Sequence, residues 1–120
     1  MKKYFIQTNP FVVPTTDGKL IEEHHGNATT QNKDISIAHM IAPPGWSEPF
    51  QTPEFDEYTY VISGKKQFII HDEIIILEAG QSIKIEKNTR VQYSNPFDFL
   101  CEYISVCTPA FDLTKVHRED

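Results

Sequence analysis

The sequence lacks a long apolar run, a basic cluster and a secretory signal. Its apolar runs fall short of the roughly 20 residues that a transmembrane helix needs. The segment after Met1, Lys2 and Lys3 is too short and too polar to form the apolar part of a signal peptide. Lys and Arg number 11 against 17 Asp and Glu, a net charge of −6, whereas nucleic-acid phosphates are bound by Lys and Arg. We therefore expect a cytoplasmic protein that binds neither membrane nor nucleic acid.

Cysteine is also scarce, and its spacing argues against a disulfide. Cys101 and Cys107 are the only two cysteines, and both lie in one strand-like run. Their offset of six positions corresponds to roughly 20 Å in a strand. A disulfide needs a Cα separation of about 4.4–6.8 Å. We expect two reduced thiols, and their even spacing places both on one face of the strand.

What the sequence does contain is enough apolar material for one folded domain. Of its 120 residues 39% are hydrophobic, with 8 Phe, 5 Tyr and 1 Trp, so the chain can bury one core but not two. Helical periodicity is weak, and short β-branched and aromatic runs recur between turn residues. Hairpin turns are predicted at Asp17-Gly18 and around residues 71–73. Many short strands at regular spacing predict an all-β sandwich or barrel.

The central segment carries a recognisable order of residues, namely Pro44-Gly45, Gln51, Pro53, Glu57, Gly64, Gly80 and Asn95. This order resembles the two motifs of the cupin family, whose fold is a double-stranded β-helix, or jelly-roll barrel. Within that family, the sequence looks like a branch of small bacterial single-domain cupins. The resemblance implies one domain over residues 1–120, with a barrel core over 35–109 and N-terminal strands within 1–33 that pack on the barrel.

The resemblance also implies that the usual metal centre has been lost. Cupins hold a metal through two histidines and a glutamate of the first motif and one histidine of the second. These positions fall on Gln51, Pro53, Glu57 and Val91. Pro53 and Val91 have no donor atom, and Gln51 offers only a neutral carbonyl. We expect no metal and no other cofactor. The alternative is a divalent metal held by Glu57 and Gln51, or a site rebuilt with the nearby acidic residues Glu48, Glu54 and Asp56.

The motif alignment fixes which side chains point into the barrel. If Glu57 points inward, strand alternation turns Thr59 and Val61 inward as well. An apolar pocket with a few polar groups is the usual form of a small-molecule site. The residues predicted to bind a ligand are Gln51, Glu57, Tyr93, Tyr103, Ser105 and Cys107. Each also has a purely structural interpretation, as a packing residue or as a buried group with hydrogen-bonded partners.

We expect from these residues a cupin that binds a small polar metabolite without a conventional metal site. Glu57 and Gln51 would hydrogen-bond the ligand, and Tyr93 and Tyr103 would frame it. The alternative is an isomerase or lyase acting on a sugar-like or carboxylate substrate, with Glu57 as the catalytic acid or base. A third possibility is a purely structural or partner-binding domain that uses an apolar outer sheet face.

Apolar residues are also predicted on the outside of the barrel. Strand alternation places six of them on the outer face of one sheet: Tyr58, Tyr60, Ile62, Ile69, Ile74 and Ile76. Exposed apolar surface of this extent usually marks an interface. We expect a homodimer that forms through Ile69, Ile74 and Ile76. The alternative is that the N-terminal segment, residues 4–13, covers this face within one chain.

Overall fold

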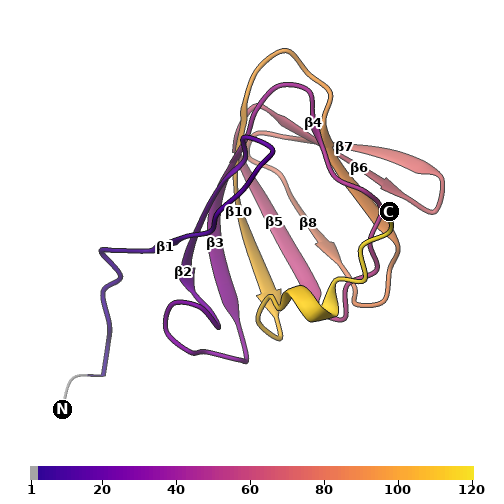
Figure 1. The fold of residues 1–120 in the computed structure, drawn as a ribbon. Coiled ribbons are helices and arrows are strands. Elements are labelled where there is room, and N and C mark those ends of the chain that lie inside the picture. The colour runs from indigo at the N-terminus through magenta and orange to yellow at the C-terminus, as the bar shows by residue number, and fades with distance from the viewer. Residues whose placement is uncertain (1–2) are drawn as a thin grey trace.

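The computed structural model describes residues 3–120, and this part of the chain is built from strands (Figure 1). It contains ten strands and one short 3-10 helix: β1 (Phe11–Val12), β2 (Leu20–His25), β3 (Ser36–Ala42), β4 (Trp46–Ser47), β5 (Asp56–Ser63), β6 (Lys65–Ile70), β7 (Glu73–Glu78), β8 (Ser82–Ile85), β9 (Val91–Asn95), β10 (Cys101–Thr108) and η1 (Leu113–Lys115). Within residues 3–120, none of the structure is a helix long and apolar enough to cross a membrane.

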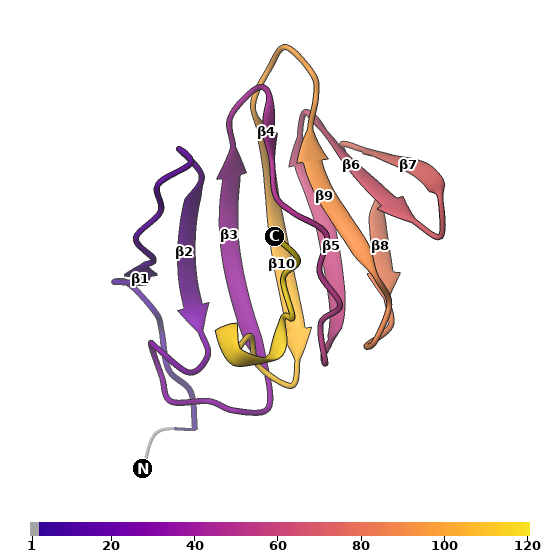
Figure 2. The ribbon, with the colours of Figure 1, turned by 45° about the vertical axis from the view of Figure 1, so that its right-hand side comes forward.

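The strands form two antiparallel sheets that face each other. One sheet has six strands in the order β1-β2-β3-β10-β5-β8, and the other has four in the order β4-β9-β6-β7. Figure 2 shows β2, β3, β10 and β5 side by side, with β9, β6 and β7 forming the second layer. The predicted all-β fold, a double-stranded β-helix, is confirmed.

Two tight turns connect strands of the barrel, and the first lies where the sequence predicts a hairpin, around residues 71–73. His71 and Asp72 join β6 to β7 and have φ angles of 50° and 63°. Positive φ at both central residues is typical of a type I′ hairpin turn. Gly64 joins β5 to β6 with φ of 78°. A Cβ atom at this position would lie 2.3 Å from the carbonyl oxygen of Leu100, so the turn requires glycine.

The interior of the barrel follows the predicted alternation. The fully buried side chains include Val61 on β5, Phe68 on β6, Val91 on β9 and Tyr103 on β10. Thr59 and Tyr93 are buried in the same way. Cys101 and Cys107 are both buried and both reduced, as expected. The strand phase inferred from Glu57 is therefore confirmed for the strands of both sheets.

The N-terminal strands extend one edge of the larger sheet. β1 pairs with β2, and β2 pairs with β3. The Gln7 side chain donates a hydrogen bond of 3.0 Å to the carbonyl oxygen of His24. The Phe5 ring packs edge-on against His25. The alternative that residues 4–13 cover the face of Ile74 is therefore wrong, because β1 and the Gln7 contact hold this segment at the β2 edge of the other sheet.

The expectation of one apolar outer face is also wrong. Tyr58, Tyr60 and Ile62 lie on β5 in the six-stranded sheet, whereas Ile69 lies on β6 and Ile74 and Ile76 lie on β7. The chain changes sheet at Gly64, between β5 and β6. The exposed apolar residues are consequently divided between two sheets rather than gathered on one.

The C-terminal segment packs back on the barrel. Asp112 caps η1 by accepting a hydrogen bond of 2.9 Å from the backbone N–H of Thr114. Val116 is buried with Phe55 and Cys107. The backbone N–H of Thr52 donates to the carbonyl oxygen of Val116 at 3.0 Å. These contacts hold the charged end of the chain at the opening between the sheets.

Candidate functional site

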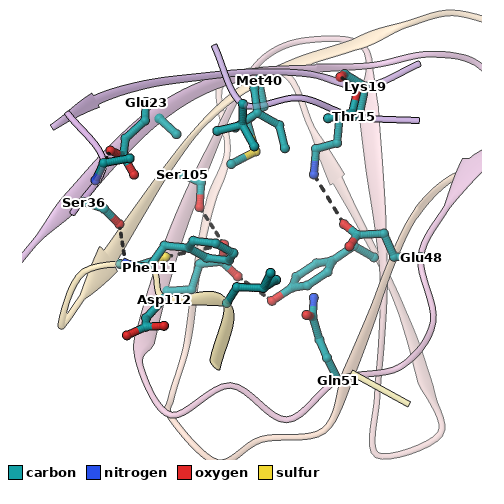
Figure 3. A pocket seen from close by; sticks show the side chains of 18 of the residues that line it. Thr15, Lys19, Glu23, Ser36, Met40, Glu48, Gln51, Ser105, Phe111 and Asp112 are labelled. Atoms are coloured by element: carbon teal, nitrogen blue, oxygen red, sulfur yellow. Dashed lines mark hydrogen bonds and ion pairs between the residues drawn. The ribbon is translucent and has the colours of Figure 1, made fainter. Parts of the chain in front are cut away.

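A cavity of about 670 Å³ lies between the two sheets. Strands of both sheets, the β1–β2 connection and the C-terminal segment all contribute to its wall (Figure 3). Part of this wall is apolar, including Ala38, Met40 and Phe55. The volume lies within the range of about 300–1,000 Å³ that is typical of small-molecule sites.

Glu57 on β5 is the most fully coordinated polar group in the cavity. The Tyr93 hydroxyl, from the opposite sheet, donates a hydrogen bond of 2.5 Å to its Oε1. The Ser105 hydroxyl donates to its Oε2 at 2.6 Å. The thiol of Cys107, which is the cross-strand neighbour of Glu57, lies 3.9 Å from the same Oε2. Three of the predicted site residues therefore meet at one carboxylate.

The Tyr93 hydroxyl and the Cys107 thiol, which contact Glu57, keep their protons. Burial raises the pKa of Tyr93 well above its ordinary value, and the charge of Glu57 raises it further. Burial, followed by the charge of Glu57, also raises the pKa of the Cys107 thiol far above its usual value. The nucleophile in cysteine chemistry is the thiolate. Tyr93 and Cys107 thus act as hydrogen-bond donors to Glu57, and the structure gives Cys107 no nucleophilic character.

Gln51 and Tyr103 differ in their position relative to the cavity. Gln51 lines the cavity, and its side-chain oxygen accepts a long hydrogen bond of 3.5 Å from Arg118. Tyr103 is fully buried and is not part of the cavity wall. The reason is that the Lys66 ammonium lies 3.7 Å from the centre of the Tyr103 ring and takes the place at the wall.

Lys66 is a cavity residue that the sequence analysis overlooked. Lys66 is only 3% exposed, and it precedes Phe68 by two positions on β6. The same alternation that turns Phe68 inward therefore turns Lys66 inward too. Strand alternation from Phe68 was thus a signal for Lys66 in the sequence, although a lysine in a strand is usually taken to face solvent.

Three further charged residues reach the cavity from segments outside the central strands. The Lys19 ammonium lies 3.4 Å from Oε1 of Glu48 and 4.3 Å from the centre of the Trp46 ring. Arg118 lies 2.7 Å from Oε2 of Glu48. Burial favours the neutral form of Lys19, but the nearby Tyr103 and Glu48 outweigh it and raise the pKa of Lys19. Lys19 and Arg118 therefore share Glu48 as their counter-ion.

The side chains present do not fit the metal centre implied by the family motif. Val91 and Pro53 are buried at two ligand positions and have no donor atom. Both carboxylate oxygens of Glu57 already accept hydrogen bonds. Among residues 3–120, no three His, Cys, Asp or Glu side chains gather in a way that could hold a metal ion. The donor set is thus that of a hydrogen-bonding site.

The other acidic residues near the motif are engaged elsewhere. Glu48 pairs with Lys19 and Arg118. Glu54 pairs with His117, and Asp56 accepts a hydrogen bond of 2.9 Å from the backbone N–H of Lys87. None of the three is directed toward Glu57 in these contacts, so they do not rebuild the missing ligand set.

Comparison with known proteins agrees with this architecture. Residues 38–107 match the family model described as a cupin domain. Over 108 residues the chain is 43% identical to a Myxococcus xanthus (strain DK1622) protein named endoribonuclease YbeY. That match covers 90% of this chain and 37% of the relative, so the chain spans little more than a third of that protein.

Solved structures share the fold at low sequence identity. Streptomyces PAC13, in a structure with uridine, is 17% identical with a TM-score of 0.77, and the match covers 100% of this chain and 92% of that one. An oxalate decarboxylase from Bacillus subtilis is 15% identical with a TM-score of 0.79, over 96% of this chain and 32% of that one. With a family model that matches more than half of its residues, the chain belongs to the cupin family.

Proposed function

We propose that this cupin binds a small polar metabolite in the cavity between its sheets, without a conventional metal centre. The observation that carries the proposal is the Glu57 carboxylate, which lines the cavity and is held from both sheets by Tyr93 and Ser105. A carboxylate has about four acceptor positions, so two donors leave capacity for a ligand hydroxyl. The fixed geometry orients that capacity before the ligand arrives.

The rest of the cavity suits the same kind of ligand. Gln51 and Ser105 provide further hydrogen-bonding groups, and Met40 and Phe55 provide apolar contact. A few fixed polar groups within an apolar wall give a small-molecule site its orientation and specificity. Tyr93 frames the ligand in this proposal, whereas Tyr103 does not reach it.

A second candidate is an enzyme that uses Glu57 as an acid or base. The specific observation is the direct hydrogen bond between the carboxylate and the protonated Tyr93 hydroxyl, which pairs a proton acceptor with a proton donor. PAC13 is described as a nucleoside dehydratase, a reaction that needs both. At 17% identity that likeness concerns the fold, so the proposal of a lyase or isomerase rests on the Glu57 geometry alone.

The name of the Myxococcus relative suggests a different activity. This chain covers 37% of that protein, and its net charge of −6 is unfavourable for RNA phosphates. We therefore do not extend the endoribonuclease activity to this chain.

A metabolite screen by thermal shift tests the proposed function. We expect hydroxylated metabolites to raise the melting temperature of the wild type, because a ligand that binds only the folded state stabilises it. In Glu57→Gln the same ligands should bind about tenfold more weakly or worse, since a hydrogen bond to a charged group contributes about 1.5–3 kcal/mol. Glu73→Gln, which removes an exposed carboxylate at the β6–β7 turn, is the control.

Two results would contradict the proposal. Equal stabilisation of Glu57→Gln and wild type would remove Glu57 from the binding site. A stoichiometric divalent metal ion found by elemental analysis of the purified protein would replace the hydrogen-bonding site by a metal centre.

We also propose that the protein forms a homodimer through the outer face of β6 and β7, at Ile69, Ile74 and Ile76. Ile74 is 63% exposed and Ile76 is 47% exposed on this face, and a twofold interface would bury both copies of each. Ile74→Glu should convert the dimer to a monomer in sedimentation velocity. Leu113→Glu, at a residue 67% exposed on η1, is the matched control and should remain dimeric. A dimer that persists in Ile74→Glu would place the interface elsewhere.

A further inference from the structure

The Lys66 ammonium is buried in the barrel without a hydrogen-bond acceptor. Its Nζ lies 3.7 Å from the centre of the Tyr103 ring, 4.8 Å from that of Tyr93 and 5.2 Å from that of Phe68. Within residues 3–120, neither a hydrogen bond nor an ion pair engages this ammonium, although the residue is only 3% exposed. Three aromatic faces are thus its only partners in the part of the chain that the structure describes.

Aromatic faces compensate a buried cation only in part. Moving an ammonium group out of water is unfavourable unless a counter-ion and hydrogen-bond acceptors replace the lost hydration. The faces of Tyr and Phe attract a cation through their quadrupole, but they accept no charge-assisted hydrogen bond. Lys66 lines the cavity, so its missing acceptor can be supplied by a molecule bound there.

The other charges of the cavity already have partners, which singles out Lys66. Lys19 and Arg118 both bind Glu48. Glu57 accepts hydrogen bonds from the hydroxyl groups of Tyr93 and Ser105. Among these charged side chains, only Lys66 has no group of opposite charge or acceptor atom within bonding distance.

Tyr93 connects the free cation to the carboxylate. Its hydroxyl donates to Glu57, while the face of its ring lies 4.8 Å from the Lys66 ammonium. The cavity therefore presents an acceptor at the hydroxyl end of this tyrosine and a cation over its ring. A ligand that satisfies both must carry a negative group and a hydrogen-bond donor a short distance apart.

We propose that the ligand is a small hydroxylated carboxylate, whose carboxylate group binds the Lys66 ammonium and whose hydroxyl donates to Glu57. This inference rests on the proposed function and names its ligand class. A carboxylate is a monoanion, and it matches the one cation that lacks a counter-ion. A phosphate dianion would need further cations, and Lys19 and Arg118 are already neutralised by Glu48.

Acetate is the probe for the anion site, and acetamide is its neutral match in size and shape. Acetate should raise the melting temperature of the wild type in a saturable way at constant ionic strength, and acetamide should not. Lys66→Met, which keeps an unbranched chain but removes the charge, should abolish the acetate effect. The control is Lys65→Met, because Lys65 is the adjacent lysine, is 41% exposed and lies 4.0 Å from Glu78 outside the cavity. This control should behave as the wild type.

A second measurement does not depend on a variant that folds. In the wild type, acetate should shift the NMR resonances of the Lys66 ε-methylene group and leave those of Lys65 unchanged. The inference is overturned if acetate stabilises Lys66→Met as much as the wild type, if acetamide acts as strongly as acetate, or if phosphate saturates the site and acetate does not. It is also overturned if acetate leaves the Lys66 resonances unmoved.

This experiment separates the ligand class from the proposed function. If neutral metabolites bind in a manner that requires Glu57 while acetate does not bind at Lys66, the carboxylate inference fails and the metabolite-binding function stands. If acetate binds at Lys66 and every metabolite stabilises Glu57→Gln as much as the wild type, the role proposed for Glu57 fails and the anion site stands.

Discussion

Phe68→Ala should lower the free energy of unfolding by about 3–5 kcal/mol, the usual cost of emptying a buried phenylalanine site. Phe68 is fully buried in the centre of β6. Its ring packs edge-to-face against Tyr93 with 5.8 Å between ring centres, and the Lys66 ammonium lies over its face. Backbone pairing holds β6 between β7 and β9, so these strands cannot collapse into the space and most of the cavity should persist. Urea denaturation followed by far-UV circular dichroism measures the loss.

Phe99→Ala is the matched control for this prediction. Phe99 is a phenylalanine of the same chain that is 51% exposed and stacks on Phe97 with 6.4 Å between ring centres. Its replacement should lower the free energy of unfolding by less than about 1 kcal/mol, because the Phe99 side chain buries little apolar surface when the protein folds. Comparable losses for Phe68→Ala and Phe99→Ala would show that Phe68 is not the packed centre of the barrel.

The barrel could be predicted from the sequence because its determinants are local. Alternation along each strand assigns faces from one fixed point, and Glu57 provided that point for Thr59 and Val61. Turn residues end the strands where backbone geometry demands them, as at Gly64 and at the His71-Asp72 turn. Both signals depend on neighbours in the chain and not on distant contacts, so they are readable before the structure is known.

The full charge pattern of the cavity could not be predicted in this way. Lys19, Glu48 and Arg118 come from the start of the chain, from the β4–β5 connection and from the C-terminal segment. Such segments have no periodicity that assigns a side chain to the interior. Only tertiary contacts, such as the pairing of Thr52 with Val116, bring Arg118 to Glu48.

The division of the outer apolar residues shows a related limit. Alternation correctly turned Tyr60 and Ile74 outward. It says which face of a strand is exposed, but not which sheet the strand joins. That depends on strand order, and consecutive strands β5 and β6 belong to different sheets.

Glu57→Leu should destabilise the fold by about 2–4 kcal/mol, although it removes a partly buried charge. The substitution leaves the hydroxyls of Tyr93 and Ser105 without their acceptor, and each buried donor left unpaired costs about 1–3 kcal/mol. The leucine variant no longer has the free-energy cost of removing a carboxylate from water, and this offsets part of that loss. Each oxygen of the carboxylate accepts a hydrogen bond from a hydroxyl group, so the charge has partners within the fold. Urea denaturation again gives the free energy.

The partners of Glu57 supply the control for this prediction. In a protein that already carries Tyr93→Phe and Ser105→Ala, only the weak thiol donor of Cys107 remains, so adding Glu57→Leu should be close to neutral. The difference between the two backgrounds measures the coupling of the carboxylate to its donors. Had Glu57 been held under strain for the sake of its ligand, Glu57→Leu would raise stability in the wild-type background, as removal of strained site residues commonly does. A gain there would mean that the Tyr93 and Ser105 contacts do not stabilise the fold, and that Glu57 depends on its ligand for compensation.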